Sequence, residues 1–243
     1  MPDLAKYLPR CAAPWIAIVV VAGIGLSAFL CLLPAVLHVV EAEQRSRCRQ
    51  NLRQIATACV AYQDIHKVFP DPKMLRRQPH APPVAIDLSW RVAILPFVEQ
   101  DALFNRFDQH AGWEHAANKL LLPARPAAFS CPWRQPPEGT QTWFQYFTGP
   151  NTLFPPGTTG VKGKEIPDGA SQVILCAEAA AAVPWTQPAD MLLTPNDPPP
   201  LPTGLVTVGL ADGSVRVIDR DRMSDTMLRW AIDPRDGNAV IWY

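Results

Sequence analysis

The feature that most constrains this chain is an uncharged stretch near its N-terminus. No Asp, Glu, Lys or Arg occurs from Cys11 to Val40. About 20 apolar helical residues cross the hydrocarbon layer of a bilayer, so this stretch is long enough to span one. A buried core helix rarely stays uncharged for so long, and the apolar part of a cleaved signal peptide is only about 7 to 15 residues long. We therefore expect a short tail at 1–13 and a transmembrane helix at 14–40 that has the lipid bilayer as its partner.

The charges that flank this stretch leave its orientation open. Two basic residues precede it, and four arginines follow it within residues 45–53. The positive-inside rule favours the second group as the cytoplasmic one. Long domains that follow a span are nevertheless translocated largely regardless of their charge. Charge alone therefore does not decide the topology.

An amphipathic helix is predicted after the span. No Pro or Gly occurs from Glu41 to His66, and one set of side chains recurs three or four residues apart: Cys48, Leu52, Ile55, Cys59, Tyr62 and His66. Such spacing places these side chains on one face of a helix. We predict that the helix covers residues 41–69 and packs this stripe on a head domain at 70–243. Tyr62 and His66 are interpreted as part of the stripe and not as catalytic residues.

The C-terminal region has the pattern of a β-hairpin. Apolar residues alternate with others in Val206–Leu210 and in Val215–Val217, and Asp212-Gly213 lies between the two segments. An Asp-Gly pair in this position is typical of a hairpin turn, so Asp212 is interpreted as a turn residue and not as a nucleophile or metal ligand. A short helix over Arg222–Ile232 and a terminal strand over Ala239–Trp242 are predicted to follow.

The remainder of the head is predicted to be rich in loops. The chain has 27 prolines, and Pro184–Pro202 is expected to be an extended surface loop that holds no site. Within Leu88–Phe107 a helix is expected to begin at Pro96, with Glu99 and Asp101 as solvated charges that point in different directions. The expected fold class is α+β, with a long N-terminal helix packed on an antiparallel sheet that carries long Pro-rich loops.

Six segments of the chain resemble one bacterial family. They are LLPAVLHVVEAEQRSRCRQNLRQIATACVAYQDIHKVFP from Leu32, LSWRVAILPFVEQDALFNRF from Leu88, SCPWR around Cys131, IPDGASQVILCAE from Ile166, VPWTQPADM from Val183 and LADGSVRVI from Leu210. In this order they are similar to blocks of the family called domain of unknown function 1559. That family is abundant in planctomycete bacteria and resembles type IV prepilins and pseudopilins such as the general secretion pathway G protein.

The resemblance implies a pilin-like protein with its N-terminus inside the cell and its head outside the cytoplasm. Prepilins of this type carry a Gly-Phe-Thr-Leu-Ile-Glu box, but this chain has Pro14-Trp15 where Gly-Phe is expected and has no acidic residue between Asp3 and Glu41. We therefore expect a permanently anchored single-pass protein of the inner membrane. Its expected role is structural or interactive, within a secretion or surface assembly, with other pilin-like subunits or cell-surface components as partners.

The cysteines of the head allow several disulfide pairings. Two of the six cysteines lie at or in the uncharged stretch, and the other four allow three pairings. The resemblance places Cys48 and Cys131 at family cysteine positions and so implies a disulfide between them. Cys59 and Cys176 are interpreted as apolar packing residues.

The chain shows no signature of a common enzyme class. Its net charge of zero argues against a nucleic-acid partner. It has no Cys-x-x-Cys, no Gly-x-Ser-x-Gly, no phosphate loop and no dinucleotide fingerprint. The loop that contains Asp108, His110, Glu114 and His115 is interpreted as a polar loop and not as a metal site. We expect no catalytic residues, no metal and no cofactor.

Three tryptophans in loops support an alternative function. Trp113, Trp133 and Trp143 are candidates for stacking on a ligand, because an indole offers a broad apolar face. The alternative is therefore an anchored extracytoplasmic module that binds glycans or peptides. The tryptophans in patterned segments are assigned to the core: Trp90, Trp185 and Trp230.

Overall fold

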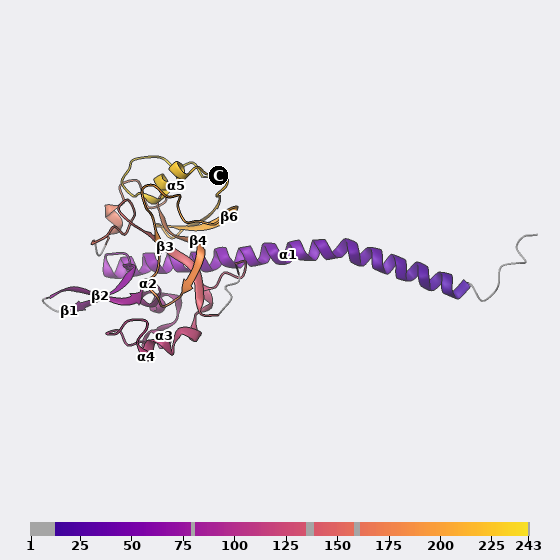
Figure 1. The fold of residues 1–243 in the computed structure, drawn as a ribbon, viewed down its shortest axis with the longest axis horizontal. Helices are drawn as coiled ribbons and strands as arrows, with labels where there is room; N and C mark the ends of the chain where they lie inside the picture. Colours follow the sequence, from indigo (N-terminus) through magenta and orange to yellow (C-terminus); the bar gives the residue numbers. More distant parts are fainter. Residues whose placement is uncertain (1–12, 79–80, 135–138, 158–160, 243) are drawn as a thin grey trace, which may run out of the picture. The chain divides into compact units, whose positions relative to one another are not determined.

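The computed structural model describes residues 13–78, 81–134, 139–157 and 161–242. The side chains of residues 13–17, 25–38, 77–78, 81–82 and 164 lie outside this description. The chain divides between Gln44 and Arg45 into two compact units, which we describe separately (Figure 1).

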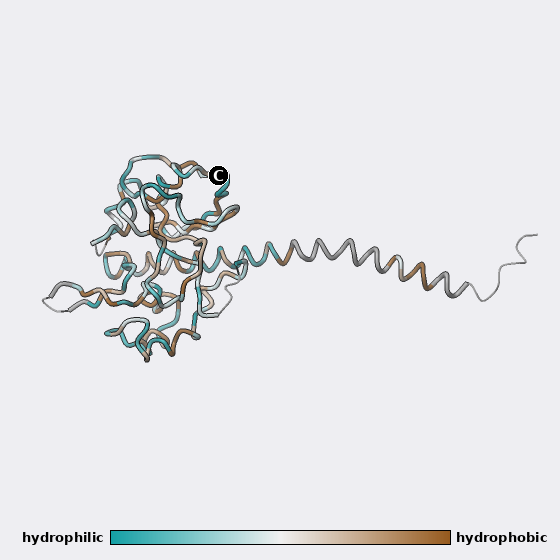
Figure 2. The backbone as a smooth tube through the Cα atoms, viewed as in Figure 1, coloured by the Kyte–Doolittle hydropathy of each residue, from teal (hydrophilic) through white to brown (hydrophobic). Residues whose placement is uncertain are grey.

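The N-terminal unit contains the first part of helix α1 (Ala13–His66). Its described side chains include exposed apolar residues at Ile18–Val21, which are brown in Figure 2. Within the described residues, no helix is both long enough and apolar enough to cross a membrane. The predicted span at 14–40 includes residues 14–17 and 25–38, whose side chains lie outside the description.

The head unit begins with the second part of α1, which follows the predicted stripe. Four of the six stripe residues are buried: Cys48, Leu52, Ile55 and Cys59. Tyr62 is half-buried and His66 is exposed, and the two rings lie 4.1 Å apart beside Phe97. The helix ends at His66, because Lys67 adopts a left-handed conformation with φ 64°.

A five-stranded sheet forms the centre of the head, with strand order β5-β3-β4-β6-β7. The strands are β3 (Gln141–Thr148), β4 (Ile174–Pro184), β5 (Met191–Leu192), β6 (Leu205–Leu210) and β7 (Val215–Asp219). All neighbours are antiparallel except β3 and β5, which are parallel. The sheet is therefore mixed at one edge. A separate hairpin joins β1 (Lys73–Gln78) and β2 (Ala81–Ser89).

The two faces of this sheet are covered by different helices. Because side chains alternate along a strand, Val206 and Val208 of β6 face helix α5 (Asp225–Ile232), whereas Gly209 faces α1. A Cβ atom on Gly209 would lie 3.2 Å from Cβ of Ala56 and 3.0 Å from Sγ of Cys176. The glycine therefore lets α1 pack closely on the sheet.

Each face has its own apolar core. The α1-side core contains buried residues of α1 together with aromatic residues from loops and β3, including Leu52, Ile55, Trp90, Phe144, Tyr146 and Trp185. The α5-side core contains mostly aliphatic residues, including Val206, Val208, Leu210, Ile218, Leu228 and Ile232. All buried residues of both cores lie between Cys48 and Val240, so the head unit has a complete core of its own.

Short helices make up most of the remaining regular structure. They are α2 (Trp90–Ala93), η2 (Leu95–Val98), α3 (Asp101–Phe104), α4 (Ala116–Lys119), η3 (Leu122–Ala124), η4 (Ala127–Phe129) and η5 (Gly163–Glu165). The helix predicted from Pro96 is interrupted, because Glu99 adopts a left-handed conformation with φ 61° between η2 and α3. Glu99 and Asp101 are exposed.

The structure also tests the predictions for the C-terminal half. The hairpin with its turn at Asp212-Gly213 is confirmed, and the predicted helix is present but begins later, at Asp225. The predicted strand at Ala239–Trp242 is wrong, since these residues pair with no strand among the described ones. The expectation that Pro184–Pro202 is only a surface loop is also wrong, because β5 lies within it and Trp185 is fully buried.

Candidate functional site

The three tryptophans expected in loops are half-buried and pack against the α1-side core, and one of them, Trp143, lies in β3 and not in a loop. The guanidinium carbon of Arg45 lies 4.0 Å from the ring centre of Trp133, and that of Arg134 lies 6.0 Å from the ring centre of Trp143. The backbone N–H of Trp113 donates a hydrogen bond to the carbonyl of Asp87 over 2.7 Å. Trp133 and Trp143 therefore each have an arginine of the protein itself beside the ring.

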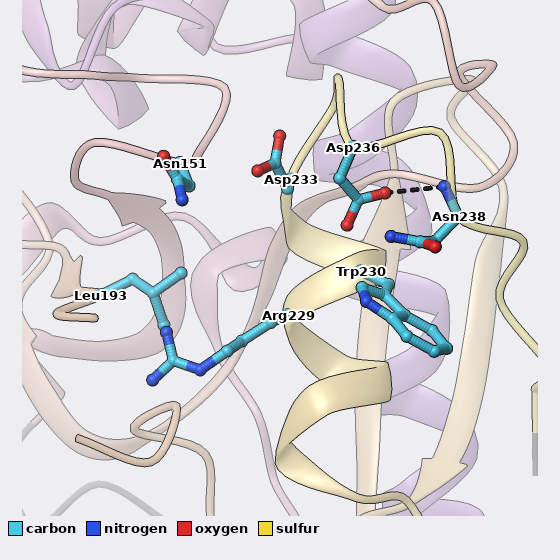
Figure 3. Close-up of a pocket in the computed structure, with 7 residues that line it drawn as sticks. All are labelled: Asn151, Leu193, Arg229, Trp230, Asp233, Asp236 and Asn238. Atoms are coloured by element: carbon cyan, nitrogen blue, oxygen red, sulfur yellow. Dashed lines mark hydrogen bonds between the residues drawn. The ribbon is translucent and has the colours of Figure 1, made fainter. Parts of the chain in front are cut away.

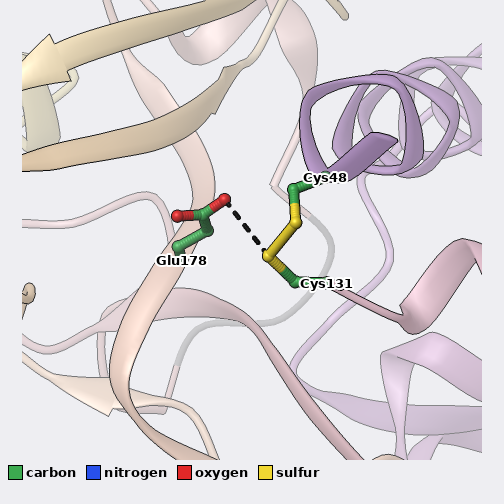
Figure 4. Close-up of side chains that lie close together, drawn as sticks. All are labelled: Cys48, Cys131 and Glu178. Carbon is green, nitrogen blue, oxygen red and sulfur yellow. Dashed lines mark hydrogen bonds between the residues drawn. A yellow bond between two sulfur atoms is a disulfide. The ribbon is translucent and has the colours of Figure 1, made fainter. Parts of the chain in front are cut away.

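A disulfide bond joins Cys48 of α1 to Cys131, which follows η4 (Figure 4). This is the pairing that the family resemblance implies. Cys59 and Cys176 are free and buried. The disulfide bridges a sequence separation of 83 residues and attaches α1 to the loop region of the head.

A buried carboxylate lies beside the disulfide. Glu178 of β4 is 2 % exposed, and its Oε1 lies 3.6 Å from Sγ of Cys131. A sulfur atom in a disulfide has no proton to donate, so this contact is not a hydrogen bond in the oxidised protein. The charge of Glu178 is balanced by Arg134, whose Nε lies 3.3 Å from Oε2. Among the described residues, Cys48, Cys131 and Glu178 are the only group with metal-ligand spacing, and the disulfide occupies both sulfurs.

The polar loop at residues 108–115 is held by its own hydrogen bonds. His110 Nδ1 lies 3.0 Å from Nη1 of Arg76, and the backbone N–H of His110 donates to Oδ1 of Asp108 over 2.9 Å. Glu114 and His115 are exposed. The buried amide of Asn118 donates to the carbonyls of Asp108, Ala111 and Gly112 and so closes the loop.

A fully buried ion pair joins α2 to the segment before β5. Arg91 and Asp190 have side chains 0 % and 2 % exposed, and Nη2 of Arg91 lies 3.0 Å from Oδ1 of Asp190. The guanidinium also donates to the carbonyl of Phe144 from Nε and Nη2, over 3.0 and 2.8 Å, and to Oγ of Ser89 over 2.8 Å. The pair therefore connects three segments that are far apart in the sequence.

Asp190 is held equally firmly by other donors. Its Oδ1 also accepts hydrogen bonds from Nε1 of Trp90 over 3.1 Å and from the backbone N–H of Tyr146 over 2.9 Å. Burial raises the pKa of the Asp190 carboxyl and lowers the pKa of the Arg91 guanidinium, and each shift is opposed by the charge of the partner. Oδ1 of Asp190 and the guanidinium of Arg91 are thus engaged in holding the fold, whereas Oδ2 of Asp190 is buried without a hydrogen-bond partner among the described residues.

Aromatic stacking and a buried thiol continue this network. The rings of Trp90 and Tyr146 are stacked 3.9 Å apart, and Tyr146 stacks on Phe154 at 4.5 Å. The Tyr146 hydroxyl lies 3.1 Å from Sγ of Cys59. Burial raises the pKa of the Cys59 thiol to about 12, so this thiol is protonated and unreactive at neutral pH.

A pocket of about 290 Å³ lies at the C-terminal end of α5 (Figure 3). It is lined by Asn151, Leu193, Arg229, Trp230, Asp233, Asp236 and Asn238. The wall opposite α5 is set by a close backbone approach: a Cβ atom on Gly149, whose φ is 137°, would lie 2.4 Å from the carbonyl oxygen of Leu193. The pocket therefore depends on a glycine just before Asn151.

Sequence reasoning missed both the buried ion pair and this pocket. One signal was present for the ion pair, because Arg91 is the only charge in the apolar stretch Leu88–Val98, and a lone charge in such a stretch is often buried with a partner. No local signal pointed to Asp190, which lies 99 positions away in a Pro-rich segment. The pocket combines residues from three separate segments, and no motif joins them.

Comparison with known proteins gives one match. The model of a family described as "Protein of unknown function (DUF1559)" matches residues 41–169, which is more than half of the chain. No curated protein matches the chain. No solved structure matches it either.

Proposed function

The chain belongs to the DUF1559 family, and on this premise we propose that it is a membrane-anchored, exported, pilin-like protein with a structural or interactive role and no catalytic activity. In this proposal it is a static single-pass protein of the inner membrane with an extracytoplasmic head. Its partners are other pilin-like subunits or cell-surface components of a secretion or surface assembly.

The anchor is supported by the sequence at the start of α1. Residues 11–40 contain no charged side chain, and a charged residue at the centre of a bilayer would cost about 2.5 to 3.5 kcal/mol. The helix assigned from Ala13 to His66 includes most of this stretch and also supplies the stripe that is buried in the head. The same helix therefore contains most of the uncharged segment and also part of the folded head.

The observation that best supports an exported head domain is the disulfide between Cys48 and Cys131. Structural disulfides form and persist in oxidising compartments and are rare in the cytosol of most organisms. The bond lies at the start of the head unit and attaches α1 to the region after η4. A head exposed to the periplasm or the exterior provides the environment that this bond requires.

The absence of catalysis is proposed from the way in which the buried charged groups are used. Arg91, Asp190 and Glu178 are each paired and bonded within the fold. A catalytic group needs access to a substrate, whereas Arg91 and Asp190 have side chains that are 0 % and 2 % exposed. Their geometry supports the role of holding segments together.

Membrane extraction tests the anchor. The native chain is expected to stay with membranes after an alkaline carbonate wash. Replacing Val20 and Ile24 with lysine should release it, because two charges would enter the hydrocarbon core. The matched control is Val40→Lys, at the end of the stretch, where a lysine can reach the headgroups and the protein should remain bound. A native chain that washes off would refute the anchor.

The redox state of the cysteines in cells tests export. Alkylation under denaturing conditions, without prior reduction, is expected to label Cys59 and Cys176 but not Cys48 or Cys131. Recovery of Cys48 and Cys131 as free thiols from fresh cells would contradict an extracytoplasmic head. The intact mass of the membrane protein then reports processing, and a chain that retains residues 1–14 supports a static anchor.

A further inference from the structure

We infer that the pocket at the C-terminal end of α5 is a binding site for a single neutral sugar ring of a saccharide. The inference concerns the head alone and does not depend on anchoring or export. The three tryptophans that the sequence suggested as stacking residues, Trp113, Trp133 and Trp143, are not among its lining residues. The site instead uses Trp230, which sequence reasoning assigned to the core.

The first argument for a sugar ligand comes from the size and composition of the pocket. Its volume of about 290 Å³ lies just below the range of roughly 300–1,000 Å³ for ligand pockets, which suits one small ring. One wall is the half-buried indole of Trp230. The lining also includes two carboxylates and two carboxamides, and in Figure 3 Asn238 lies on the same side of α5 as Trp230, with Asn151 and Leu193 across from α5. A sugar ring offers an apolar C–H face to an indole and hydroxyl groups to such a rim.

The helix geometry places the main groups together. Asp233 follows Trp230 by three residues and Arg229 by four, so both are its neighbours on the surface of α5 and its final turn. Arg229 donates to the carbonyl of Thr194 over 2.9 Å and to the carbonyl of Asp197. These bonds hold the guanidinium against the loop across from α5, so that it forms a fixed wall.

The two carboxylates are positioned in the same way. Oδ1 of Asp233 accepts from the backbone N–H of Arg235 over 3.0 Å, and Oδ1 of Asp236 accepts from that of Asn238 over 2.8 Å. In both residues one oxygen fixes the side chain, and Oδ2, which has no bond to the described part of the chain, can accept one from a ligand hydroxyl. The amide groups of Asn151 and Asn238, both exposed, can donate to and accept from the same ligand.

The charge of the pocket favours a ligand that has no carboxylate or phosphate. Two carboxylates face one guanidinium in the pocket, and the helix end adds partial negative charge. An anionic sugar would meet net repulsion here. Neutral hexopyranoses are therefore favoured over uronic acids and sugar phosphates.

Saturation-transfer NMR on the full-length chain tests the inference. The protein is held in a detergent without a sugar headgroup, and D-glucose, D-galactose, N-acetyl-D-glucosamine and D-glucuronate are added one at a time. Transfer to at least one neutral sugar is expected, with an affinity of about millimolar for so small a ligand. D-glucuronate should bind at least about tenfold more weakly. No transfer to any neutral sugar, or preferential binding of D-glucuronate, would overturn the inference.

Two exposed positions make the test specific. Asp236→Asn keeps an oxygen for the turn but removes the charged acceptor, and Asn238→Ala removes an amide; each should weaken binding by about tenfold. The matched control is Asp212→Asn. Like Asp236, Asp212 precedes a glycine and accepts a hydrogen bond from the backbone N–H two residues later, over 2.8 Å. Unlike Asp236, it lies outside the pocket. Unchanged binding in both pocket variants, with thermal midpoints equal to the native value, would place the ligand elsewhere and refute the site.

Discussion

The two cores of the head, on opposite faces of one sheet, are held together in different ways. The α1-side core contains a disulfide, a fully buried ion pair and a run of stacked aromatic rings. The α5-side core contains mostly aliphatic side chains beneath one eight-residue helix. Directional bonds specify the first core, and burial of apolar area stabilises the second.

This difference follows from the segments that each core must join. The α1-side core collects α1, α2, strands β3 and β4, loops and the segment before β5, which are distant in sequence. Cross-links and charge-assisted hydrogen bonds select one arrangement of such segments. The α5-side core is built from α5 and one face of the regular sheet, so side-chain alternation along the strands brings most of its residues together.

The largest effect is expected from removing the disulfide. Replacing Cys48 and Cys131 with serine should lower the free energy of unfolding by about 4.5 kcal/mol, the chain-entropy value for a separation of 83 residues. The measurement is urea unfolding of the native and variant proteins, with reduction of the native protein as a second route to the same state. A loss below about 1 kcal/mol would mean that the α1-side core does not need the cross-link.

Breaking the buried ion pair should cost nearly as much. Asp190→Ala leaves Arg91 charged and unpaired in the core, and we expect a loss of about 4 kcal/mol of unfolding free energy. The double variant with Arg91→Met should lose less than the sum of the two single variants, because no uncompensated charge remains. Additive losses in this double-mutant cycle would show that the two groups do not interact.

A cavity in the α5-side core tests the other side of the comparison. Leu228 is fully buried there, and Leu228→Ala should reduce the unfolding free energy by about 3 kcal/mol through lost burial and an unfilled cavity. The matched control is Leu205→Ala, since Leu205 is 48 % exposed and should change stability by less than about 1 kcal/mol. Similar losses for the two variants would argue against a distinct second core.

The smallest effect at neutral pH is expected from the buried thiol. The pKa of Cys59 is about 12 in the folded protein, above the ordinary value of 9.0, so the folded state holds this proton more tightly than the unfolded state does. Its contribution to stability is complete below pH 9 and is lost as the pH rises from 9 towards 12. The urea midpoint should fall over that range and should fall less steeply in Cys59→Val. A flat profile in the native protein would contradict the burial of this group.

Much of the framework could be predicted from the sequence. The stripe through Cys48, Leu52, Ile55 and Cys59 and the hairpin around Asp212-Gly213 were predicted correctly, because helical and strand periodicities are local and repeat over many residues. The helix at Pro96 was predicted too simply, since one left-handed residue, Glu99, divides it. Short elements of this kind depend on contacts that periodicity does not reveal.

The family membership and the expected cysteine pair came from sequence patterns, but the chemistry of the interior did not. Arg91 and Asp190 lie 99 positions apart, and they meet because β5 pairs in parallel with β3 and brings the Pro-rich segment back to the sheet. The pocket near α5 likewise requires the close approach at Gly149. Sequence determines elements through local periodicity, whereas sites built from distant segments are decided only when the chain has folded and side chains from different elements are brought within bonding distance.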